Sequence, residues 1–78
     1  MTIGKRLREA RMSIGRSITQ LADQSKVSKT SISAYEHDAI EPSFFKMIQI
    51  ANALGVSLDW LAGRTEIKQL QRTQIRRW

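Results

Sequence analysis

The chain has 78 residues, of which 41% are hydrophobic and 26% are charged, and its 13 Lys and Arg against 7 Asp and Glu give a formal net charge of +6. This length and composition predict one compact folded domain and exclude a second folded unit, and the absence of cysteine excludes disulfides and thiolate metal ligands. The positive charge favours a polyanionic partner, nucleic acid more than an acidic membrane. The sequence contains no long apolar run, so neither a membrane span nor a secretory signal is predicted.

The first predicted helix covers roughly Ile3 to Ser13. Its apolar residues Ile3, Leu7 and Ala10 fall three or four positions apart, so they form one stripe along a helix. Gly15 follows at the place where glycine commonly ends a helix. The pattern therefore predicts a first helix with one face directed at the core.

A second helix is predicted to open at Ser17. Gln20 lies three residues later, which is the capping-box spacing at which two side chains satisfy each other's backbone amides. Ile18, Leu21 and Ala22 supply the inner face of this helix.

The third predicted helix runs from about Lys29 to His37, with Ser28 placed to cap its start. Only Ile32 and Tyr35 are expected to face inward. The remaining side chains are mostly short or polar, so the outer face is narrow and hydrophilic. A helix of this kind fits a DNA major groove.

The fourth and fifth helices complete the predicted elements. Pro42 prevents continuation of the third helix, Ser43 is placed to cap the fourth, and Gly55 ends it. The expected inner stripe of the fourth helix is Phe44, Met47, Ile48, Ala51 and Leu54. Ser57 caps a short helix from Leu58 to Ala62, closed by Gly63. No segment alternates as a strand does, so the fold class is predicted to be all-α.

A family resemblance is carried by five segments: Ile3–Arg8, Gln20–Ala22, Val27–Glu36, Glu41–Ser43 and Ala53–Leu61. In order and spacing they resemble the Cro/CI-type (XRE) helix-turn-helix family of phage repressors and bacterial regulators. The resemblance implies a five-helix, lambda-repressor-like DNA-binding domain over residues 1–63. It also implies a homodimer on a pseudo-palindromic operator of double-stranded DNA, with two recognition helices in successive major grooves about 34 Å apart.

The same resemblance places base-contacting side chains at Lys29, Thr30 and Ser33. The Lys29 ammonium can donate to guanine O6 and N7, and the Thr30 methyl group can contact a thymine methyl group. Phosphate contacts are implied for Ser28, Ser31 and Ser43, helped by helix N-termini that favour anions. These contacts would position the protein without selecting a sequence.

Three departures from the family pattern change the expected contacts. Ile18 stands where many relatives have a phosphate-contacting glutamine, and the loop 37–41 is acidic where relatives are often basic. Further phosphate contacts are therefore expected from Lys5, Arg6, Lys46 and the tail, and His37 is expected at a helix end facing a phosphate. Lys26 stands where glycine is usual, so we expect it in the left-handed conformation.

Arg11 and Glu36 occupy positions at which the family pairs an arginine late in its first helix with the glutamate that ends the recognition helix. The resemblance therefore implies a structural ion pair. One histidine without cysteine supports no familiar metal site. We predict no catalytic residue, metal or cofactor, and a protein that is not an enzyme and acts in the cytoplasm of a bacterial or phage-infected host cell.

Residues 64–78 lie outside the resemblance and carry five basic side chains and one acidic one. They fit a partly disordered basic end, an amphipathic helix on this domain or a partner chain, or a membrane-surface segment, although no membrane partner is expected because the segment is short and weakly apolar. Two functions remain open: an operator-binding repressor, or an antitoxin or interaction module that binds a partner protein through the tail. Deletion of residues 64–78 distinguishes them.

Overall fold

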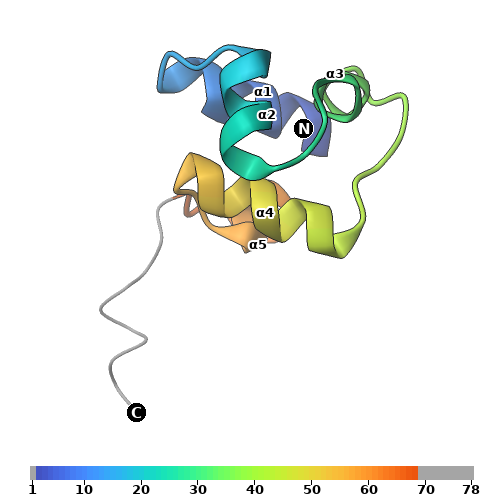
Figure 1. Cartoon of the computed structure of the whole chain (residues 1–78). Coiled ribbons are helices and arrows are strands. Elements are labelled where there is room, and N and C mark those ends of the chain that lie inside the picture. The colour runs from blue at the N-terminus through green and yellow to red at the C-terminus, as the bar shows by residue number, and fades with distance from the viewer. Residues whose placement is uncertain (1, 69–78) are drawn as a thin grey trace.

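The computed structural model describes residues 2–68, and these fold into five helices (Figure 1). The helices are α1 (Ile3–Ser13), α2 (Ile18–Ser25), α3 (Lys29–Glu36), α4 (Phe44–Leu54) and α5 (Leu58–Leu61). The predicted all-α, five-helix fold is confirmed. The third and fifth helices each end one residue earlier than expected, because His37 and Ala62 are the C-caps.

Every helix begins after a hydroxyl side chain that accepts the backbone amide three residues later. The five caps are Thr2, Ser17, Ser28, Ser43 and Ser57. At Ser17 the arrangement is reciprocal, because the Gln20 side chain accepts the Ser17 amide at 2.8 Å, so the predicted capping box is confirmed. Loss of one such cap typically costs about 1 kcal/mol.

The turn between α2 and α3 fixes how these two helices meet. Lys26 has φ 62° and ψ 27°, the left-handed conformation expected for it, and its amide donates to the Ala22 carbonyl. The buried Ser25 hydroxyl donates to the Leu21 carbonyl at 2.7 Å, and Val27 is almost fully buried. The turn is therefore anchored on the core, and α3 emerges from it in a defined direction.

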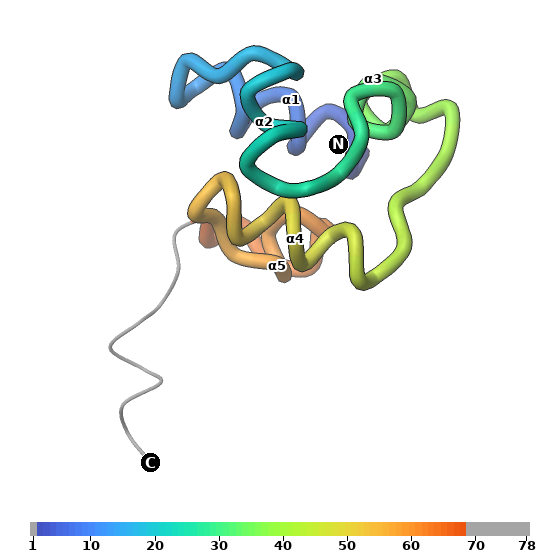
Figure 2. Tube along the Cα trace, viewed as in Figure 1, coloured from blue at the N-terminus to red at the C-terminus, as the bar shows by residue number. Residues whose placement is uncertain are grey.

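The core lies between a group formed by α1, α2 and α3 and a second group formed by α4 and α5 (Figure 2). Its buried members are Leu7, Ala10, Leu21, Val27, Ile32, Tyr35, Met47, Ile50, Ala51, Leu54, Val56, Trp60 and Leu61. The expected inner stripe of α4 needs three corrections, one of which is that Ile48 is only half-buried and lies outside the core. Phe44 is 70% exposed, whereas Ile50, which the stripe omitted, is fully buried. Phe44 is the first residue of α4, and the buried face of this helix begins only at Met47, one turn later.

The start of α1 packs closely against the end of α3. Gly4 is buried, and a Cβ at this position would lie 2.2 Å from the Tyr35 carbonyl oxygen and 2.5 Å from Oδ1 of Asp38. The Thr2 hydroxyl donates to the Asp38 carboxylate at 3.0 Å. Only a residue without a side chain allows the two backbones this approach.

Residues 64–68 are held on the domain without forming a helix. Arg6 donates to the carbonyl oxygens of Trp60 at 3.0 Å and Thr65 at 3.3 Å, and the Ser57 amide donates to the Lys68 carbonyl at 2.8 Å. The Arg6 guanidinium carbon and Lys68 Nζ lie 5.0 and 5.1 Å from the centre of the Trp60 ring, within cation–π distance. The rest of the tail, residues 69–78, and with it the interpretation of the tail as a partner-binding element, lies outside the described residues.

Candidate nucleic-acid interface

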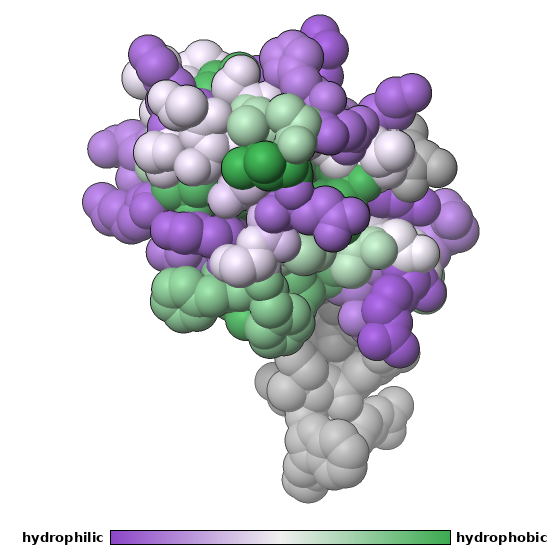
Figure 3. Space-filling model, turned by 90° about the vertical axis from the view of Figure 1, so that its right-hand side faces the viewer, coloured by the Kyte–Doolittle hydropathy of each residue, from purple (hydrophilic) through white to green (hydrophobic). Residues whose placement is uncertain are grey.

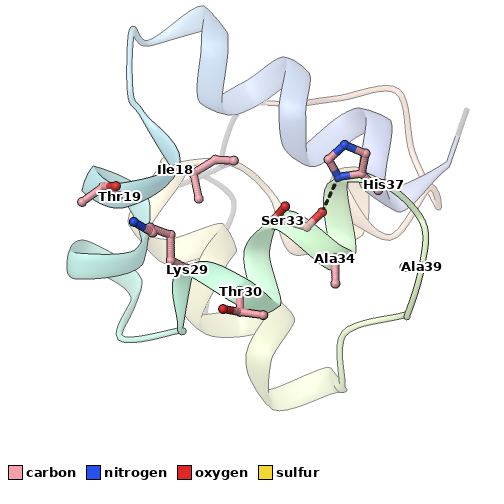
Figure 4. Close-up of a pocket in the computed structure, with 8 residues that line it drawn as sticks. All are labelled: Ile18, Thr19, Lys29, Thr30, Ser33, Ala34, His37 and Ala39. Carbon is pink, nitrogen blue, oxygen red and sulfur yellow. Dashed lines mark hydrogen bonds between the residues drawn. The ribbon is translucent and has the colours of Figure 1, made fainter.

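A groove of about 690 Å³ lies between the start of α2 and the outer face of α3 (Figure 4). It is lined by Ile18 and Thr19 from α2, by Lys29, Thr30, Ser33 and Ala34 from α3, and by His37 and Ala39 beyond it. The first residues of α2 form one wall because the turn at Lys26 brings α3 back past them. The groove is therefore built by the two helices of the helix-turn-helix.

All three side chains expected to contact bases line this groove. Residues four positions apart lie on one line along a helix. One such line along α3 contains Lys29, Ser33 and His37, and the neighbouring line contains Thr30 and Ala34 (Figure 4). Lys29 and Thr30 are exposed, and within residues 2–68 the Lys29 ammonium makes no ion pair. The outer surface of α3 thus presents one cationic donor, two hydroxyl groups and two methyl groups.

The serines expected to contact phosphate are at helix starts. Ser28 accepts the Ser31 amide at 3.1 Å and donates to the Ser31 hydroxyl oxygen at 2.9 Å. Ser43 accepts the Lys46 amide at 3.2 Å. Because Ser28 donates its hydroxyl hydrogen to Ser31, the phosphate contact expected of Ser28 is not supported, whereas Ser31 and Ser43 have a hydroxyl hydrogen to donate to an outside acceptor. Lys5 is exposed in the first turn of α1, and Lys46 is half-buried in the first turn of α4.

His37 closes the groove at the far end of α3 and is exposed. Its Nδ1 lies 2.8 Å from the Ser33 carbonyl oxygen, an atom that only accepts, so Nδ1 carries a hydrogen. The neutral ring therefore presents an acceptor at Nε2, and only the imidazolium presents a second N–H. The phosphate contact expected of His37 requires that charged form.

Arg6 does not fit the phosphate contact expected of it. The residue is 6% exposed, and its guanidinium donates to Trp60, Thr65 and the Glu66 carboxylate. In the sequence Arg6 is one of several basic residues near the N-terminus, and nothing distinguishes it from the others. Arg6 lies on the face of α1 that is directed at α5, so its guanidinium binds carbonyl oxygens inside the protein and is not available to a phosphate.

The Arg11 and Glu36 side chains form a bidentate ion pair that joins α1 to the end of α3. Nε of Arg11 lies 2.6 Å from Oε2 of Glu36, and the Nη2–Oε1 distance is 3.0 Å. The third donor of Arg11 binds the Arg16 carbonyl at 2.7 Å. The hydrogen bond to Glu36 raises the pKa of the Arg11 guanidinium, burial opposes this, and the charge of Glu36 adds to the rise. The ion pair therefore joins the end of α3 to α1.

Four residues of the groove were not expected as site residues: Ile18, Thr19, Ala34 and Ala39. The site residues expected from the sequence were all polar or charged, whereas three of these four residues, Ile18, Ala34 and Ala39, are apolar. The available signal was the position of Ala34 four residues after Thr30, which puts both methyl groups on one line of the helix. Within residues 2–68, no cluster of three His, Asp or Glu side chains could hold a metal ion. None of the described helices is long and apolar enough to cross a membrane.

Comparison with known proteins gives a consistent result. Residues 7–61 match the family described as Helix-turn-helix. The chain is 31% identical over 75 residues to the HTH-type transcriptional regulator ImmR of Bacillus subtilis (strain 168), covering 96% of this chain and 59% of ImmR. It is 34% identical over 76 residues to the cryptic phage CTXphi transcriptional repressor RstR of Vibrio cholerae serotype O1, covering 97% of this chain and 68% of RstR.

Among solved structures, the fold is similar to that of the P22 c2 repressor protein in complex with a synthetic operator. The TM-score is 0.78 at 26% sequence identity, and the match covers 83% of this chain and 98% of that chain. The chain spans less than two thirds of the length of ImmR, whereas it covers nearly all of the P22 c2 repressor chain in that complex.

Proposed function

This chain belongs to the Cro/CI-type (XRE) helix-turn-helix family, and on that premise we propose that it represses transcription by binding a pseudo-palindromic operator as a homodimer. It acts by binding DNA and not by catalysing a reaction, in the cytoplasm of a bacterial or phage-infected host cell. The observation that carries the proposal is the groove beside α3, into which Lys29, Thr30 and Ser33 project. The complex of the similar P22 c2 repressor with an operator supports this assignment.

In the proposed complex, α3 lies in the major groove. Lys29 donates to guanine O6 or N7, the Thr30 methyl group meets a thymine methyl group, and Ser33 exchanges a hydrogen bond with a base edge. The phosphates on either side are bound by Ser31, Ser43, Lys5, Lys46 and His37 in its charged form, whereas the Ser28 hydroxyl stays bonded to Ser31. A second copy places its α3 one helical turn, about 34 Å, further along the duplex. The bound dimer then occupies the DNA and excludes other proteins from it.

Selection of bound oligonucleotides from a random pool with the purified protein tests this function. We expect an enriched motif with two-fold symmetry, because two copies of α3 contact two half-sites. The mass of the protein–DNA complex should correspond to two chains on one duplex. A pool that shows no enrichment after repeated rounds would contradict sequence-specific binding.

Lys29→Ala is expected to relax base preference at one position of each half-site and to weaken operator binding by about 1–3 kcal/mol. The reason is that the lost ammonium donates to one base pair and to no other. Lys46→Ala is the matched control. It removes a lysine expected to contact phosphate, so it should weaken all sequences alike and reduce the salt dependence of binding by about one ion. Titration of operator variants at two salt concentrations measures both effects, and unchanged base preference in Lys29→Ala would overturn the role given to Lys29.

The methyl contact of Thr30 is tested by removing each methyl group in turn. Thr30→Ser keeps the hydroxyl group and deletes only the methyl group, and uracil in place of thymine deletes only the partner methyl group. We expect each change to weaken binding about fourfold, since a buried carbon of this kind contributes about 0.8 kcal/mol. The two changes together should cost no more than one of them alone. Additive losses at every thymine of the half-site would show that the two methyl groups do not touch.

A further inference from the structure

The part of the groove that follows Lys29 along α3 is lined by methyl groups and hydroxyl groups. Ala34 is half-buried on the outer face of α3, one turn after Thr30, and Ile18 is half-buried on the wall formed by α2. Figure 4 shows the Ile18 side chain directed from α2 toward α3. Figure 3, which views the right-hand side of Figure 1, shows hydrophobic side chains among hydrophilic ones at the height of α3. The groove therefore offers apolar contacts for which the hydrogen bonds of Lys29 and Ser33 do not account.

The side chains around Ala34 differ from Lys29 in what they distinguish on a base pair. The Lys29 ammonium only donates hydrogen bonds, so it distinguishes an acceptor such as guanine O6 from an amino group. Ala34 and Ile18 carry no polar side-chain atom, and the Ser33 hydroxyl group both donates and accepts. Thymine presents an acceptor at O4 where cytosine presents an amino group at N4, and thymine alone of the two carries a methyl group at C5. Side chains of this kind accept either polar group and respond to the methyl group.

We propose that Ala34 is a further specificity-determining residue, which selects the C5-methyl group of a pyrimidine and therefore binds 5-methylcytosine as well as thymine. This inference rests on the proposed function, because it requires α3 to lie in a major groove. Ile18 closes the other side of the same site and keeps water from the bound methyl group. Methylation of a cytosine at C5 in such a half-site then strengthens binding, so the protein responds to the methylation state of the DNA.

The spacing of the two methyl-bearing side chains of α3 predicts where the methyl groups lie on the DNA. Cβ atoms four positions apart on a helix are about 5–6 Å apart. Successive bases of one strand rise by about 3.4 Å. Thr30 and Ala34 can therefore reach methyl groups on neighbouring base pairs, and we expect the half-site to carry a C5-methylpyrimidine at each of them.

The test measures binding of the wild-type protein to duplexes that differ by single methyl groups. At each base pair of the selected half-site in turn, the pyrimidine is thymine, uracil, cytosine or 5-methylcytosine, each opposite its complementary purine. Titration gives the affinity for each duplex. Only the DNA changes in this comparison, so it does not depend on the folding of a variant.

At one base pair, next to the one that responds to Thr30→Ser, thymine and 5-methylcytosine are expected to bind within about twofold of each other. Each should bind about fourfold more tightly than uracil and cytosine, which is the effect of burying one carbon. Ala34→Gly should reduce this methyl preference to below twofold. Ala53→Gly is the matched control, because Ala53 is a half-buried alanine of α4 outside the groove, and it should keep the preference. Both substitutions carry the same helix penalty, and melting temperatures establish that both variants are folded.

Three results would overturn the inference while the proposed function stands. The first is equal binding of cytosine and 5-methylcytosine at every base pair of a selected operator. The second is strong rejection of 5-methylcytosine relative to thymine at the base pair with the methyl preference, since the polar edge would then be distinguished. The third is a methyl preference that Ala34→Gly retains in full. If no duplex were selected or bound, the inference and the proposed function would fail together.

Discussion

Arg11→Ala is expected to destabilise the domain by about 3–5 kcal/mol, because it leaves a buried carboxylate without its partner. The Glu36 side chain is 4% exposed, and both of its oxygens are bound by Arg11. The Arg16 carbonyl loses its donor as well. Domains have a total stability of about 5–15 kcal/mol, so the variant is expected to lose a large part of it and to melt at a much lower temperature. Thermal and urea denaturation followed by circular dichroism measure the change.

Two further variants show whether the charge is the cause. Arg8→Ala removes an exposed arginine from the same helix and should change the stability by no more than about 0.5 kcal/mol. Arg11→Met combined with Glu36→Leu removes both charges and keeps the volume, so it should recover most of the stability lost in Arg11→Ala. A melting temperature for Arg11→Ala equal to that of the wild type would refute the assigned role of this ion pair.

Gly4→Ala is expected to destabilise the domain by about 3 kcal/mol or more, although alanine is the better helix former by about 1 kcal/mol. The added Cβ would lie 2.2 Å from the Tyr35 carbonyl oxygen, a backbone atom that cannot rotate away. The start of α1 would have to move from α3, and the hydrogen bond between Thr2 and Asp38 would break with it. Urea denaturation gives the loss directly.

The double variant Gly4→Ala, Asp38→Ala separates the clash of the new Cβ with the Tyr35 carbonyl oxygen from its clash with the Asp38 side chain. It removes the Asp38 side chain, whose Oδ1 would lie 2.5 Å from the new Cβ, but leaves the Tyr35 carbonyl in place. We expect most of the destabilisation to remain. If Gly4→Ala were instead as stable as the wild type, α1 and α3 would not approach as closely as the structure has them.

Features that depend on neighbouring residues could be predicted from the sequence. The Ser17 cap needs only Gln20 three positions on, and the left-handed conformation of Lys26 was implied by the glycine that the family usually has at this position. The helix bounds follow from such local signals, because caps and glycines mark them. The family resemblance implied Lys29, Thr30 and Ser33 as base-contacting residues, and the periodicity of one short helix placed them on its outer face, where they line the groove.

Apart from the Arg11–Glu36 ion pair, which the family resemblance implied, contacts between distant residues were missed. Arg6 is placed by Trp60, 54 positions away, and nothing next to Arg6 in the sequence distinguishes it from the exposed Lys5. Phe44 fits the period of the inner stripe, but whether a helix turn is covered depends on where the other helices end. The spacing of Ala34 from Thr30 puts it on the outer face of α3, but only the arrangement of α2 against α3 makes that face the wall of a groove.

The packing of residues 64–68 determines where the chain can safely be shortened. A fragment trimmed at the end of α5 would take Thr65 and Glu66 from the Arg6 guanidinium and Lys68 from the face of Trp60, leaving a buried cation short of acceptors. Such a fragment would lose stability for reasons unrelated to any partner. The deletion of residues 64–78 therefore does not distinguish a partner-binding tail from a dispensable one, as the sequence suggested it would, and the cut must fall after Lys68.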